Sequence, residues 1–86
     1  MNLDDFHKKF LEENPEWGIA EQISSMLRKC RTEAGFTQHE LAKKMHTKQS
    51  GIARAEKRSP KFVPTLEFMD RFARACGKKL KLPEII

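Results

Sequence analysis

Apolar residues recur three and four positions apart along most of the chain, which is the spacing of one face of an α-helix. A first stripe near the N-terminus comprises Leu3, Phe6, Phe10 and Leu11. A longer stripe follows, made of Ile19, Ile23, Met26, Leu27, Cys30 and Ala34, and its helix is expected to expose Arg28, Lys29 and Arg31. The last stripe comprises Leu66, Met69, Phe72, Ala73 and Cys76. The pattern predicts an all-α protein.

Residues that favour helix ends divide the chain into five short helices. Side chains that can accept a hydrogen bond at a helix N-terminus precede the expected helices, at Asn2, Asn14, Thr37 and Thr65. Thr37 with Glu40 has the spacing of a capping box. Gly35 and Gly77 suit helix C-termini. Between the long second helix and the last one, these signals predict two short helices, over about 38–45 and 48–57.

The two short helices have the arrangement of a helix-turn-helix unit, in which a capped first helix is joined by a brief turn to a second. Four small or apolar residues are spaced to hold the pair together, namely Ala42, Met45, Ile52 and Ala55. Polar side chains stand where the second helix would meet base edges, at its N-terminal end. The pattern therefore favours a domain that reads duplex DNA.

The chain divides into three expected parts. Residues 1–16 would form an acidic helical extension, 17–77 the helix-turn-helix domain and 78–86 a tail. In the tail, Leu80 and Leu82 alternate with lysines, which allows a short strand. A lone strand lacks a partner in its own chain, so pairing across a dimer is a hypothesis.

Charge is distributed unevenly along the sequence. The net charge is +5, yet residues 1–22 carry two lysines against six acidic residues, a net −4, and the remainder carries +9. A basic domain suits an anionic partner such as DNA. The acidic part suits either an intramolecular contact or a second, basic partner.

Two segments resemble the XRE/Cro–C1 helix-turn-helix family, whose fold is lambda-repressor-like. "TQHELAKKMHTKQSGIARAEK" is similar to the family pattern TQxxLAxxxGxSQxxISxxE, and "VPTLEFMDRFARACG" is similar to its closing helix. Together the likeness covers about residues 20–77. Three positions depart from the pattern: His46 replaces a turn glycine, Lys48 replaces a Ser/Thr cap, and Ala53 replaces a serine. If that position has a positive φ, a histidine can adopt it at some conformational cost.

The resemblance implies a set of DNA contacts. Base contacts would come from Lys48, Gln49, Ser50 and Arg54, with Gln49 able to bind adenine through both amide atoms. Gln38 would touch a phosphate or an outer base, and the phosphate candidates are Thr37, Lys57, Arg58 and Lys61. Gly51 falls in the first turn of the second helix, where the absence of a side chain would let the backbone approach DNA. For each residue the alternative is an ordinary solvated position.

The N-terminal extension and the "GKKLKL" tail look most like HigA-type antitoxins of toxin–antitoxin modules. That likeness implies a dimeric repressor that neutralises an RNase-type toxin and represses its own operon. Phe6, Phe10 and Trp17 would then anchor the toxin, as aromatic residues often do at interfaces; the alternative is that they pack on the domain. A stand-alone repressor and a protein-interaction module without DNA binding remain open.

No pattern of catalytic residues is present. The three histidines and two cysteines have no metal-ligand spacing, and there is no phosphate-binding glycine loop. We therefore expect no enzyme activity, no cofactor and no metal. Cys30 and Cys76 are expected to be reduced, and the N-terminus has no signal-peptide pattern, so a cytoplasmic location is expected.

Overall fold

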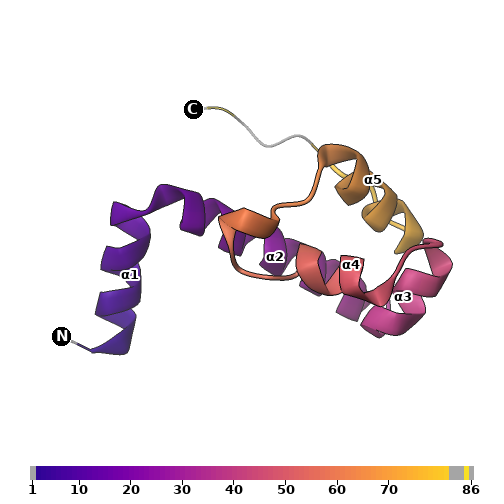
Figure 1. Ribbon diagram of the computed structural model, residues 1–86, viewed down its shortest axis with the longest axis horizontal. Coiled ribbons are helices and arrows are strands. Elements are labelled where there is room, and N and C mark those ends of the chain that lie inside the picture. Colours follow the sequence, from indigo (N-terminus) through magenta and orange to yellow (C-terminus); the bar gives the residue numbers. More distant parts are fainter. Residues whose placement is uncertain (1, 82–84, 86) are drawn as a thin grey trace.

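The computed structural model describes residues 2–81 and 85, and within them the chain forms five α-helices and one 3-10 turn, with no strand (Figure 1). The elements are α1 (Leu3–Glu13), α2 (Pro15–Glu33), α3 (Gln38–Lys44), α4 (Gln49–Ala55), η1 (Pro60–Phe62) and α5 (Leu66–Ala75). The all-α, five-helix prediction is confirmed. Leu80 lies outside regular structure, and Leu82, the other half of the suggested strand, lies outside the described residues.

Most helices begin at the predicted caps because a local side-chain oxygen accepts an otherwise unpaired backbone N–H. Asn2 Oδ1 accepts from the Asp5 amide at 2.8 Å. Thr65 Oγ1 accepts from the Phe68 amide at 3.1 Å. Asn14 is the exception, because its side-chain Nδ2 donates to the Phe10 carbonyl at 2.9 Å. Asn14 therefore closes α1 and makes no side-chain cap for α2, contrary to the prediction.

The core lies where α2, α3, α4 and α5 meet. Each helix contributes one large side chain with at most 2% exposure: Leu27, Leu41, Ile52 and Phe72. Ala42, Met45 and Ala55 are also buried in this cluster. The predicted apolar lock between the two short helices is thus present, and it fixes the orientation of α4 against the rest of the molecule.

The buried face of α2 is rotated from the one predicted. Its buried residues are Ala20, Ser24, Leu27 and Cys30, whereas Ile19 and Met26 are 57% and 43% exposed. Small side chains at the first two of these positions allow η1 to pack against α2. The sequence pattern counted only apolar residues, so it missed Ser24 and chose the neighbouring stripe. Leu66, expected on the inner face of α5, is likewise exposed.

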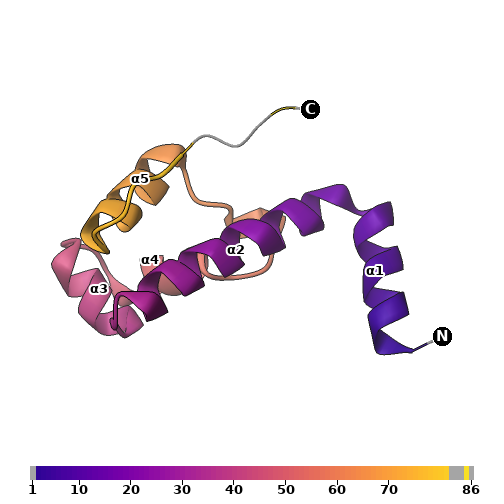
Figure 2. The same ribbon diagram turned by 180° about the vertical axis from the view of Figure 1, so that it is seen from behind.

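Helix α1 projects from the body at the N-terminal end of α2 (Figures 1 and 2). None of its residues is buried. It is held to α2 by an edge-on contact between the rings of Phe10 and Trp17, with centroids 5.9 Å apart, and by His7 and Glu21 at 3.1 Å. Because α2 begins at Pro15, the proposed boundary between residues 16 and 17 falls in its first turn.

None of the described helices combines the length and the apolarity needed to cross a lipid bilayer.

Candidate nucleic-acid interface

The turn between α3 and α4 places the second helix of the unit. His46 has φ +54°, so it adopts the left-handed conformation, and the cost considered for a histidine at this position applies. The turn is closed by the Thr47 amide, which donates to the Ala42 carbonyl at 2.9 Å. Lys48 is the N-cap residue of α4 and makes no side-chain cap. The helix therefore begins without capping at Gln49, and the predicted span of 48–57 is shortened to Gln49–Ala55.

The C-terminal end of α4 is anchored by a buried carboxylate. Glu56 is 2% exposed and accepts hydrogen bonds from Arg31 Nε at 2.7 Å and Nη2 at 2.9 Å. The hydrogen bond to Glu56 raises the pKa of the Arg31 guanidinium above its ordinary value. A two-point contact of this kind fixes direction as well as distance. Arg31 also donates to the Phe36 carbonyl at 2.8 Å, so one side chain ties together α2, the loop before α3 and the end of α4.

The buried carboxylate also positions a pair of glutamines at the surface. Gln38 Nε2 donates to Glu56 Oε1 at 3.2 Å, and Gln49 Nε2 donates to Gln38 Oε1 at 3.2 Å. A glutamine amide has two N–H donors and one carbonyl acceptor. Gln49 therefore keeps one N–H and its carbonyl oxygen for an outside partner, which is the set needed to bind adenine in a major groove.

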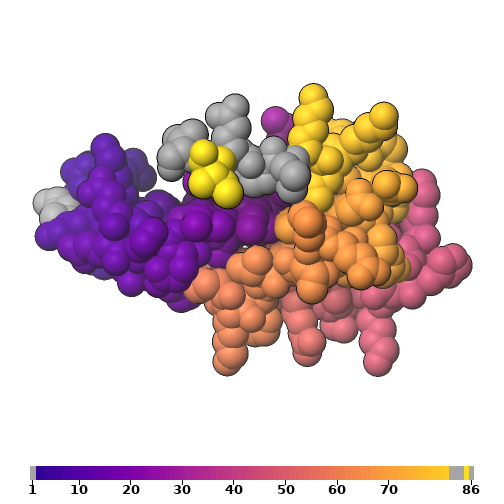
Figure 3. Space-filling model, turned by 90° about the horizontal axis from the view of Figure 1, so that it is seen from above, coloured from indigo at the N-terminus to yellow at the C-terminus, as the bar shows by residue number. Residues whose placement is uncertain are grey.

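The remaining predicted DNA contacts lie around the glutamine pair and along the segment that follows α4. Thr37, Lys48, Ser50 and Arg54 have exposed side chains, as have Lys57, Arg58 and Lys61. Figure 3 shows long side chains from the α3-to-η1 part of the chain, in pink to orange, projecting from one edge of the molecule. This shared edge is consistent with one contact surface; the individual contacts stay predictions.

Two of the predicted phosphate contacts have partners within the chain. The Lys57 ammonium lies over the Phe62 ring, 4.8 Å from its centroid. Arg58 Nη1 lies 4.0 Å from Glu21 Oε1 on α2. Both side chains stay exposed, so these contacts orient them at the end of α4 without removing them from solvent.

Arg31 was placed on the wrong side of α2 by the sequence analysis, since its side chain is only 13% exposed. The sequence spacing does indicate the true position of Arg31. Ser24, Leu27 and Arg31 are three and four residues apart, so they share one face of the helix. Glu56 was noticed only as a match to the family pattern. Its pairing with a residue 25 positions away has no local sequence signature.

The histidines and cysteines of the chain were also candidates for metal binding. The described part of the chain holds no group of three His, Cys, Asp or Glu side chains that could bind a metal. Cys30 and Cys76 are both free. Burial, followed by a hydrogen bond that the Cys76 thiol donates to Cys30, raises the pKa of Cys76 to about 12, so Cys76 is a poor nucleophile at neutral pH.

A short capped helix, a turn and a second helix with an exposed polar N-terminal end define a helix-turn-helix DNA-binding protein. The family model of XRE-type helix-turn-helix domains matches residues 27–82, and the chain belongs to this family. It is a DNA-binding regulator of that type. No curated protein and no solved structure gave a significant match to the chain. The match begins within α2, so α1 and residues 15–26 of α2 lie outside the matched family domain.

Proposed function

We propose that the protein is a sequence-specific transcriptional repressor that binds duplex DNA as a two-fold dimer in the cytoplasm. The observation that carries this proposal is the placement of Gln49. Its amide is held by Gln38, which is held in turn by the buried Glu56. A side chain whose orientation is set before DNA arrives loses less entropy on binding and discriminates better between bases.

The proposed binding geometry follows from the fold. The N-terminal end of α4 enters the major groove, where Gln49, Ser50 and Arg54 face base edges and Lys48 reaches a base or a phosphate. Lys57, Arg58 and Lys61 contact the backbone, and Thr37 and Gln38 meet it at the N-terminus of α3. Two copies then bind half-sites roughly 34 Å apart, one turn of DNA. Repression of its own operon is the proposed biological role.

The test is a titration of Gln49→Ala against DNA from upstream of the gene and against single base substitutions of it. The variant is expected to bind about 1–3 kcal/mol more weakly and to lose discrimination at one base pair. Gln22→Ala, at an exposed glutamine of α2 that is not among the predicted DNA contacts, is the matched control. Unchanged affinity and specificity for Gln49→Ala would show that α4 does not read the sequence.

A second, finer proposal is that the repressor is the antitoxin of a type II toxin–antitoxin module. The observation in its favour is the extension, where the Phe6 side chain is 61% exposed on an acidic helix, as a hot spot for a basic protein would be. Phe10 and Trp17 pack on each other, yet Phe10 keeps 37% of its surface exposed. All three stay predictions as partner contacts.

The antitoxin proposal is tested with the product of the neighbouring reading frame. That product should be a small basic ribonuclease, and adding this chain in equimolar amount should suppress its cleavage of RNA. If the neighbour cleaves no RNA, or if its cleavage is unaffected by this chain, the stand-alone repressor is the better description.

A further inference from the structure

Helix α1 carries an apolar stripe that the chain itself does not cover. Leu3 is 86% exposed, Phe6 61% and Phe10 37%, and no residue of the helix is buried. These three residues follow the three- and four-residue spacing of one helix face. A stripe of this size, on an element that contacts α2 through His7 and Phe10 and leaves Leu3 and Phe6 exposed, points to an intermolecular contact.

The charges beside this stripe are negative. Residues seven positions apart lie nearly above one another on a helix. Asp4 is therefore on the same side of the stripe as Leu11, and Glu13 is on the side of Phe6. One acidic residue thus borders each side of the stripe. Lys8 lies on the opposite side of the helix, whereas Lys9 lies about 40° beyond Glu13. The exposed face of α1 is therefore apolar along its middle, with an acid next to each edge of the stripe.

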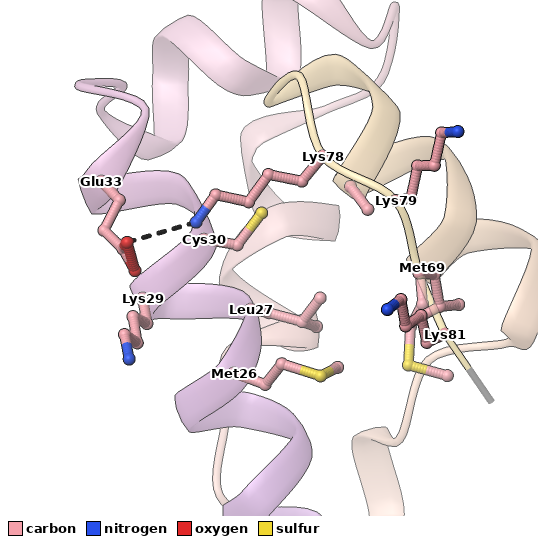
Figure 4. A pocket seen from close by; sticks show the side chains of 11 residues that line it. Met26, Leu27, Lys29, Cys30, Glu33, Met69, Lys78, Lys79 and Lys81 are labelled. Carbon is pink, nitrogen blue, oxygen red and sulfur yellow. Dashed lines mark hydrogen bonds and ion pairs between the residues drawn. The ribbon is translucent and has the colours of Figure 1, made fainter. Parts of the chain in front are cut away.

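A groove of complementary character lies between α2, α5 and residues 78–81, with a volume of about 520 Å³. Its apolar walls include Met26 and Leu27 from α2 and Met69 from α5. Figure 4 shows Met26 and Leu27 pointing from α2 across the groove toward Met69. Met26 is 43% exposed, which is high for a methionine beside a core.

The border of the groove is basic. It holds four lysines against one glutamate, and that glutamate, Glu33, is paired with Lys78 at 3.2 Å. Lys29, Lys79 and Lys81 are exposed, and no ion pair is formed by them within the described residues. In Figure 4 the ammonium of Lys81 lies beside Met69 on the groove side. The groove thus offers an apolar floor between positive edges.

We propose that α1 of one copy docks in the groove of a second copy, and that the second copy returns the same contact. Leu3 and Phe10 are separated by seven residues, or about 10 Å along the helix, and Met26 and Glu33 on the α2 wall have the same separation. Asp4 and Glu13 would face the lysines at the groove edges. A reciprocal contact of this kind is a two-fold interface, in which the same pair of surfaces is used twice.

The groove does not hold the α1 of its own chain in the structure. Helix α1 joins α2 at Pro15, whereas the groove begins at Met26, about 16 Å farther along α2. Figure 2 shows α1 and α5 at opposite ends of α2. A second molecule can supply the complementary surface, because each chain carries both halves.

The proposed interface leaves the DNA-reading surface open. Helix α4 lies in front of α2 in Figure 1, and in the reverse view of Figure 2 α2 and the segment after α5 lie in front. The groove thus opens on the side away from α4. The inference rests on the dimeric form of the proposed repressor and names the surfaces that would form it.

The test exchanges charges between the two surfaces and measures mass by sedimentation equilibrium without DNA. One full-length variant is Asp4→Lys with Glu13→Lys, and the other is Lys79→Glu with Lys81→Glu. The wild-type protein is expected to be a dimer. Each variant alone places like charges together at both contacts, so its dimer dissociation constant should rise at least about tenfold.

An equimolar mixture of the two variants is the decisive sample. The basic α1 of the first variant then meets the acidic groove of the second, and the acidic α1 of the second meets the basic groove of the first. Both contacts are restored, so the mixture should form heterodimers with wild-type strength. Asp5→Lys with Glu12→Lys makes the same charge change on the other side of α1, and this control should dimerise normally.

Three results would overturn the inference. A monomeric wild-type protein would show that no second copy occupies the groove, and would leave α1 to a partner such as a toxin. A dimer unaffected by either variant would place the interface elsewhere. Variants that dissociate but do not recover on mixing would show that the surfaces do not meet each other. Circular dichroism confirms that each variant keeps its helices, and none of these outcomes depends on DNA binding.

Discussion

Gly51 occupies the third residue of α4, in the first turn of the helix that carries the proposed base contacts. Its φ is negative, so the turn does not require a glycine there. A Cβ at this position would lie 3.4 Å from Thr47 Oγ1, an ordinary contact that leaves room for a methyl group. The structure therefore supplies no internal reason for glycine, and the remaining explanation is the surface that it presents.

Replacing Gly51 separates these two explanations. Gly51→Ala should stabilise the protein by up to about 1 kcal/mol, because alanine restricts the unfolded chain and favours helix. Urea denaturation measures that gain. If the backbone of Gly51 approaches DNA closely, operator affinity should fall in the same variant. Unchanged affinity would contradict a close approach at this position.

Glu56 is the residue on which the site depends most. Glu56→Gln keeps the shape of the side chain but leaves Arg31, which is 13% exposed, without its anion. We expect a loss of stability on the order of 3 kcal/mol, measured by urea denaturation, because a largely buried charge loses its partner. The double variant Arg31→Met with Glu56→Met should recover most of that loss. A single variant as stable as the wild type would show that the pair contributes orientation but little stability.

The α3–turn–α4 element has a favourable helix cap at its start and an unfavourable backbone conformation in its turn. Its N-terminus has a complete capping box, in which Thr37 Oγ1 accepts from the Glu40 amide at 3.1 Å and Glu40 Oε1 accepts from the Thr37 amide at 3.0 Å. The hydrogen bond from the Thr37 amide to the Glu40 carboxylate lowers the pKa of Glu40. At the other end of α3, His46 is the one residue other than glycine with positive φ among the described residues.

The strain at His46 can be measured. His46→Gly should stabilise the protein by up to about 1 kcal/mol, since glycine adopts the left-handed conformation without a Cβ clash. Thermal or urea denaturation gives the value. His46→Ala is the matched control, because alanine keeps the Cβ and should bring no comparable gain. Equal effects of the two substitutions would place the cause in the imidazole and not in the backbone.

At the scale of the whole molecule, charge and shape divide the protein into two regions. The acidic N-terminal part lies at one end of the elongated fold (Figure 1), and side chains of the α3-to-η1 part of the chain project along one edge (Figure 3). A phosphate contact is expected to position the protein on DNA without selecting a sequence. Arg58, which is 59% exposed at the end of α4 and near Glu21, is a suitable probe of that role.

Removing Arg58 should weaken binding to all DNA sequences by a similar factor. Each phosphate contact releases counterions, so Arg58→Ala is expected to reduce the slope of log affinity against log salt by about 1. Fluorescence titration over a range of salt concentrations measures the slope. Lys8→Ala, a matched loss of positive charge on α1, should leave it unchanged. A loss confined to certain base sequences would instead assign Arg58 to base readout.

The sequence by itself determined the features that depend on neighbouring residues. Helix ends at Asn2, Thr37 and Thr65 could be predicted because their capping hydrogen bonds span three residues. The helix-turn-helix unit and the position of Gln49 followed from the local spacing of apolar and polar residues. Family membership agrees with the same segment.

Only the tertiary structure decided which distant residues meet. The Arg31–Glu56 pair joins positions 25 residues apart, and the Gln38–Glu56 contact joins positions 18 apart. Neither has a local pattern, because their geometry comes from the packing of α2, α3 and α4 around one core. The same packing chose Ala20 and Ser24 for the buried face of α2 and left Phe6 uncovered. Hydrophobic spacing identifies a helix, but which of two neighbouring stripes is buried depends on how closely the next element can approach.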